Sequence, residues 1–94
     1  MMAESIRRYA CATGRVQGVG FRMFVRQQAV MNDMTGWVMN MSDGTVTMEL
    51  QGTKPAVEAA FAAIRAGNHF IHVERLDIEK RELVSGERGF SIKY

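Results

Sequence analysis

Apolar and polar residues alternate along residues 6–13, where β-favouring types are frequent. A period of two predicts a strand with one buried face, which ends at Gly14 before a glycine-rich turn. From residue 21 the spacing becomes helical, because four apolar side chains fall on one face: Phe21, Phe24, Val25 and Ala29. The Asn32-Asp33 pair is expected to end this helix.

A β-hairpin is predicted next. Residues 37–39 form a short apolar strand that ends near Asn40, and Ser42-Asp43-Gly44 supplies the turn. The returning strand covers residues 45–50 and is closed by Gly52. Asp43 is therefore expected to shape the turn rather than to act in catalysis.

A second amphipathic helix follows the hairpin. Thr53 suits the N-cap, and Pro55 is tolerated in the first turn because its missing N–H costs nothing there. Apolar residues then recur at helical spacing up to Gly67-Asn68: Val57, Ala60, Phe61 and Ile64. Residues 73–78 predict another strand, and alternation at Phe90, Ile92 and Tyr94 predicts a last one.

The element order is therefore β-α-β-β-α-β with one extra terminal strand. This order predicts an α+β, ferredoxin-like sandwich, in which two helices cover one face of an antiparallel sheet. No repeat or linker divides the chain, so residues 1–94 are expected to form a single domain.

Composition narrows the class of function. The formal net charge is +2 and no Lys or Arg run forms a basic patch, so neither a nucleic-acid nor a membrane partner is suggested. Residues 1–8 lack the apolar stretch of a signal peptide, and Cys11 is the only cysteine, which excludes an internal disulfide. We therefore expect a cytoplasmic protein in which Cys11 is a packing residue.

Several other residue types have simple structural explanations. The eight methionines suit soft packing of the core, with a methionine-lined interaction surface as the alternative. Arg7, Arg8 and Arg15 are expected to face solvent. His69 and His72 lack a third ligand candidate, so no metal site is expected.

The segment from Gly14 to Arg22 carries the candidate chemistry. Three glycines in seven residues let the backbone adopt positive φ angles, and consecutive amides in such a turn form a nest for an anion. The turn leads into a helix N-terminus, which also favours negative charge. Arg22 in the first turn can hold two oxygens of a phosphoryl group. The Gly-Lys-Ser/Thr of a Walker A loop and the third glycine of a dinucleotide fingerprint are both missing.

These residues resemble the acylphosphatase family. Its signature Gly-x-Val-Gln-Gly-Val-x-Phe-Arg is matched in full by residues 14–22, and a second signature is similar to Gly36-Trp37-Val38-Met39-Asn40 with the later Gly44, Val46 and Gly52. The ending Gly89–Tyr94 is similar to the closing strand of the family. The resemblance covers almost the whole chain.

The resemblance implies a reaction and a site. Acylphosphatases hydrolyse acyl phosphates to a carboxylate and inorganic phosphate without a metal or organic cofactor, and a monomer is expected. By this resemblance Arg22 and the loop bind the phosphoryl group, and Asn40 positions the attacking water. The implied substrate-binding residues are Gln17, Gly18, Val19, Gly20, Phe21 and Arg22. Met41 departs from the small polar residue that many relatives have after the asparagine.

Two alternatives belong to other classes of function. Domains similar to acylphosphatase occur within larger carbamoyl-transferring proteins, where a binding module is conceivable, although the free-standing chain counts against this. Residues 88–94 partly echo an RNA-recognition strand, but such a strand should lie at the centre of the sheet with an aromatic motif on its neighbour.

Overall fold

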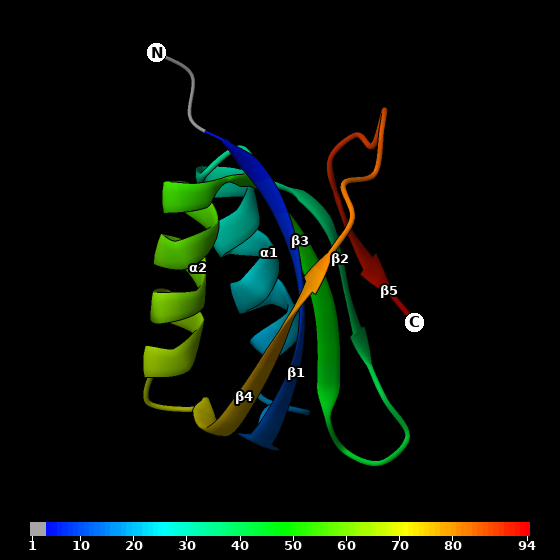
Figure 1. Ribbon diagram of the computed structural model, residues 1–94. Coiled ribbons are helices and arrows are strands. Elements are labelled where there is room, and N and C mark those ends of the chain that lie inside the picture. The colour runs from blue at the N-terminus through cyan, green and yellow to red at the C-terminus, as the bar shows by residue number, and fades with distance from the viewer. Residues whose placement is uncertain (1–3) are drawn as a thin grey trace.

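Two helices lie side by side on one face of a five-stranded sheet in the computed structural model, which describes residues 4–94 (Figure 1). The predicted ferredoxin-like α+β fold is confirmed. The elements are β1 (Ser5–Arg15), α1 (Phe21–Met31), β2 (Thr35–Asn40), β3 (Val46–Thr53), α2 (Lys54–Ala66), β4 (His72–Arg81) and β5 (Phe90–Lys93).

The strand order is β4-β1-β3-β2-β5, and the sheet is mixed rather than wholly antiparallel. Only β5 is paired in parallel, with β2, among the described strands. The reason is the connection over residues 82–89, which returns the chain at the same end of the sheet, so β5 runs opposite to β4 and along β2. β5 is also an edge strand, which removes the central position that the RNA-binding alternative requires.

The core lies between the helices and the covered face of the sheet. Phe21, Val25 and Ala29 of α1 are buried as the helical spacing predicted, while Phe24 is only partly buried. The face predicted for α2 is buried in full, and the Thr53 hydroxyl caps that helix by accepting a hydrogen bond from the Ala56 amide. Small residues of β1 and larger ones of β3 complete the core: Ala10, Ala12, Val46, Met48 and Leu50.

Arg7 is buried, with 2% of its surface exposed, and the expectation that it faces solvent was wrong. Strand alternation places Arg7 on the face of the sheet opposite the helices. There the 82–89 connection folds over it, and Glu87 pairs with its guanidinium while Glu49 and Gln51 of β3 accept further hydrogen bonds. Arg8 is partly buried and Arg15 is exposed.

The methionines divide between the core and the surface, and a methionine-lined interaction surface stays a prediction. Met34 and Met48 are buried in the core, whereas Met23, Met31 and Met41 are exposed. Cys11 is a free thiol and only partly buried. No helix among residues 4–94 is long and apolar enough to cross a membrane. The start of the 1–8 segment, where no signal peptide was expected, lies outside the described residues.

Candidate active site

The loop of residues 16–20 joins β1 to α1 and is held by a buried side chain at each end, Val16 and Phe21. Gly18 and Gly20 have φ angles of 74° and 77°, in the left-handed region that favours glycine. The amides of residues 18–20 donate no main-chain hydrogen bond within the described part of the chain. They remain available to an anion.

Gly20 is also the N-cap of α1, and its lack of a side chain leaves the helix without a side-chain cap. The first amides of a helix have no partner inside it and attract negative charge. The loop and the start of α1 therefore both present N–H groups, which carry partial positive charge. The glycine spacing predicted an anion site at these N–H groups, and anion binding there stays a prediction.

Gly14 has a different reason to be glycine. Its φ is 129°, and a Cβ at this position would lie 2.3 Å from the main-chain oxygen of His72 on β4. The pairing of β1 with β4 shifts its register between Thr13 and Gly14. The first glycine of the signature thus permits close contact between two strands rather than contact with a ligand.

Gln17 connects the loop to the β2–β3 turn. Its side-chain Nε2 donates hydrogen bonds to the main-chain oxygens of Met41 and Thr45, each at 2.8 Å. The turn itself is closed by Asp43, whose carboxylate accepts from the amide and hydroxyl of Thr45, as expected for a turn residue. The side chain of Gln17 therefore positions the loop beside the end of β2.

Asn40 is the last residue of β2 and pairs with Val46 across the hairpin. Alternation from the fully buried Val38 turns Asn40 toward the helix side of the sheet. Its Oδ1 is buried and accepts no hydrogen bond from the described residues. A buried acceptor without a partner is uncommon in folded proteins, and such groups are found where a ligand or a water molecule binds.

A cavity of about 130 Å³ brings these parts together. Arg22 and Asn40 lie on its walls, although 18 positions separate them in the chain. The other wall residues are Val16, Gly18, Gly20, Phe21 and Met23. Of the loop residues expected to bind substrate, Gln17 and Val19 do not line the cavity, and Val19 packs against the core instead.

Residues 93 and 94 orient the side chain of Arg22. Its Nη1 donates a hydrogen bond to the main-chain oxygen of Lys93 at 3.3 Å, and its Cζ lies 4.8 Å from the ring centre of Tyr94. No carboxylate among residues 4–94 pairs with it, so its charge is not neutralised within that part of the chain. Sequence reasoning missed these two contacts, because Lys93 lies 71 positions after Arg22 in the chain and such a separation leaves no local signal.

Comparisons with known proteins agree with one another. The family model described as acylphosphatase matches residues 8–92. A protein named acylphosphatase from Geobacillus kaustophilus is 47% identical over 88 residues, which cover 94% of each chain. The crystal structure of acylphosphatase from Bacillus subtilis has a TM-score of 0.89 at 34% identity, and the match covers 95% of this chain and 99% of that one. A full-length HypF, crystallised in a phosphate- and nucleotide-bound form, contains the same fold at 27% identity, with a TM-score of 0.89 over 12% of its chain.

Proposed function

Because this chain belongs to the acylphosphatase family and is a hydrolase of that type, we propose that it hydrolyses acyl phosphates to a carboxylate and inorganic phosphate at the cavity between Arg22 and Asn40. One observation carries the proposal. A positively charged side chain, free loop amides and an unpartnered buried oxygen line the same small cavity. Its volume suits a phosphoryl group and a water molecule rather than a nucleotide.

The phosphoryl group binds at the helix start. Amides of residues 18–20 donate to its oxygens, and Arg22 donates two parallel hydrogen bonds from its guanidinium. Charge on these oxygens is redistributed as the bond to the acyl group breaks, so donors that are already in place stabilise the transition state. The contacts from Lys93 and Tyr94 restrict the motion of Arg22 before substrate arrives.

Asn40 positions the attacking water. Its buried Oδ1 accepts a hydrogen bond from the water, which orients a lone pair of the water oxygen toward phosphorus. An asparagine is too weak a base to remove the proton, so an oxygen of the substrate phosphate receives it. None of the described residues on the cavity wall is His, Asp or Glu, and this mechanism requires none of them.

The leaving group explains why a general acid is dispensable. A carboxylate departs, and its conjugate acid has a pKa of about 4 to 5, like that of an Asp or Glu side chain. It therefore needs no proton as the bond breaks. Positioning and charge stabilisation remain as the tasks of the protein, and the residues named above supply both.

The departure at Met41 affects this mechanism little. The contact that Met41 makes with the loop is through its main-chain oxygen, which Gln17 binds, while its side chain is exposed. Any side chain at this position can offer the same carbonyl. We infer that the loop and Asn40 stay aligned despite the substitution.

Hydrolysis of benzoyl phosphate in the presence of a chelator tests the proposal, with inorganic phosphate as a competitive inhibitor. Arg22→Ala should abolish measurable turnover, and Arg22→Lys should recover little of it, because lysine lacks the bidentate geometry of arginine. Arg15→Ala, which changes an exposed arginine just before the loop, is the matched control for charge. Full turnover in Arg22→Lys would refute the role given to Arg22.

A further inference from the structure

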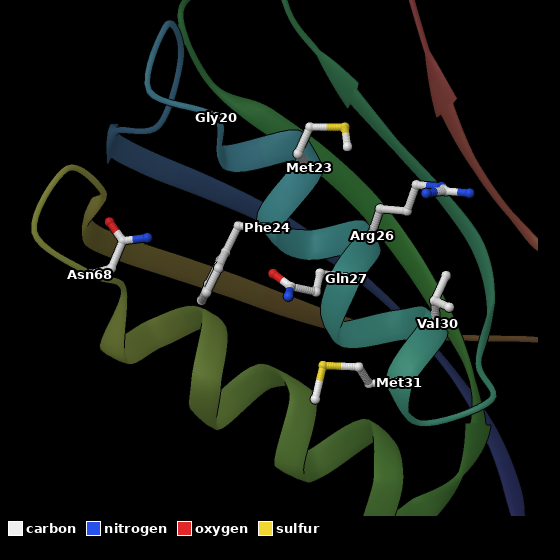
Figure 2. A pocket seen from close by; sticks show the side chains of 8 residues that line it. All are labelled: Gly20, Met23, Phe24, Arg26, Gln27, Val30, Met31 and Asn68. Carbon is white, nitrogen blue, oxygen red and sulfur yellow. The ribbon is translucent and has the colours of Figure 1, made fainter.

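A second and larger cavity opens directly beside the phosphate cavity. It measures about 480 Å³, runs along the exposed side of α1, and shares Gly20 and Met23 with the smaller one (Figure 2). Its polar walls are formed by Arg26 and Gln27 of α1 and by Asn68, which follows α2. We call this cavity the α1 groove.

The walls of the α1 groove are mainly apolar although they face solvent. Met23, Val30 and Met31 are 58%, 54% and 69% exposed, and the partly buried Phe24 adds an aromatic surface. Figure 2 shows these side chains spaced along the helix from its first turn to its last. Phe24 packs partly against the core, but Met23, Val30 and Met31 do not, so core packing does not explain these three apolar side chains on α1. Grouped exposed apolar side chains mark binding surfaces.

The position of these apolar side chains beside the phosphate cavity indicates which part of the substrate they contact. A substrate whose phosphoryl group sits in about 130 Å³ must extend its acyl group beyond that space. In an in-line displacement the leaving group departs on the side away from the attacking water. Gly20 and Met23 line both cavities, so the groove begins beside the phosphate cavity, and among the two cavities only the phosphate cavity is lined by Asn40.

We propose that the α1 groove binds the acyl group of the substrate, and that this protein prefers acyl phosphates with an extended apolar acyl chain over acetyl phosphate. The proposal rests on the proposed function. From Met23 to Met31 the helix rises about 12 Å, which accommodates a medium-length acyl chain. Methionine side chains are flexible and polarisable, so they adapt to chains of different shape.

A homologous series of substrates tests the groove: acetyl, butyryl, hexanoyl and octanoyl phosphate with the intact chain. We expect kcat/KM to rise about twofold for each added methylene, since an open groove covers a methylene only in part. The increase should come from KM. An octanoyl analogue that ends in a carboxylate should lose most of the gain. A preference for that analogue would overturn the assignment of an apolar acyl site, because it would show recognition of a second anion.

Two variants locate the chain along the helix. Met23→Ser should flatten the series from butyryl phosphate onward, whereas Val30→Ser, about two helical turns further on, should lower kcat/KM only for the longest chain. Leu83→Ser is the matched control, because Leu83 is 55% exposed on the 82–89 connection and outside both cavities. Unchanged slopes in both groove variants would overturn the proposal.

The results of these experiments distinguish a failure of the groove proposal from a failure of the proposed function. If the wild type hydrolyses every member of the series at the same kcat/KM, the acyl phosphatase activity stands and the groove proposal fails. If it hydrolyses none of them, the proposed function itself fails. A flat series together with a dimer that Met31→Ser dissociates would assign these apolar side chains to contact between two copies of the chain, and would likewise overturn an acyl site.

Discussion

The side-chain amide of Gln17 donates a hydrogen bond of 2.8 Å to the main-chain oxygen of Met41, and so joins the loop of residues 16–20 to the end of the strand that carries Asn40. A second bond from the same nitrogen reaches Thr45, also at 2.8 Å. Both acceptors are main-chain groups. Beyond the pairing of β1 and β2 with β3, the side chain of Gln17 thus fixes the loop relative to the end of β2.

Gln17→Glu should disturb this spacing. The substitution keeps the size of the side chain but places a carboxylate against two carbonyl oxygens, so both hydrogen bonds are lost. We expect kcat/KM for benzoyl phosphate to fall about tenfold or more and the free energy of unfolding to fall by about 1–3 kcal/mol. Gln28→Glu makes the same change of charge on α1, where the side chain has no hydrogen bond among the described residues, and should behave like wild type. Equal losses in both variants would assign the effect to charge alone.

Asn40→Ala should separate chemistry from binding. The substitution removes the oxygen that orients the water, so we expect kcat to fall by about 100-fold or more while the inhibition constant of phosphate stays close to that of wild type. Stability should be unchanged or slightly raised, because an unpartnered buried acceptor is removed. Kinetics and denaturant unfolding check both parts. Loss of phosphate affinity would show that Asn40 binds the phosphoryl group rather than the water.

Tyr94 should support phosphate binding by Arg22 through the face of its ring rather than through its hydroxyl. The Arg22 guanidinium lies over this ring, and a cation–π contact at an exposed site contributes about 0.5–1 kcal/mol. Tyr94→Leu should therefore raise the inhibition constant of phosphate about two- to fivefold, whereas Tyr94→Phe should leave it unchanged. A competitive inhibition assay distinguishes the two. Equal effects of Leu and Phe would implicate the hydroxyl.

Acid stability should depend on the ion pair between Arg7 and Glu87. Burial of Glu87 opposes its ionisation, but hydrogen bonds from Arg7 and Thr35 and the nearby positive charge outweigh burial and hold its pKa below the usual value for glutamate. A carboxylate whose pKa is depressed by folding stabilises the protein above its unfolded pKa, about 4.3, and that stabilisation is lost as the pH falls through the folded value.

Glu87→Gln tests the ion pair by denaturant unfolding at several pH values. We expect a loss of about 2 kcal/mol at pH 7, because the buried guanidinium keeps only Glu49 as a charged partner. Below pH 4 the difference from wild type should shrink. Glu82→Gln, an exposed position on the same connection, is the control and should follow wild type throughout. A constant difference at all pH values would contradict a role for ionisation.

Local patterns predicted most of the fold because they reflect short-range physics. The apolar spacing of α1 and α2 follows the helical period, the Thr53 cap needs only its own first turn, and the Asp43 turn spans three residues. The turn within the Gly14–Arg22 signature could likewise be predicted directly, since the left-handed glycines and the start of α1 depend only on neighbouring residues.

Contacts between distant segments were decided only by tertiary structure. Nothing near Arg7 in the sequence indicates that residues 82–89 will cover it, and the parallel pairing of β5 depends on where the same connection returns the chain. The contacts of Arg22 with Lys93 and Tyr94 and the placement of Arg22 and Asn40 on one cavity arise in the same way. Periodicity determines which side of its own element a residue occupies. The residues that pack against that side come from segments distant in the sequence. No local pattern indicates which segments these are, so tertiary packing decides the contact.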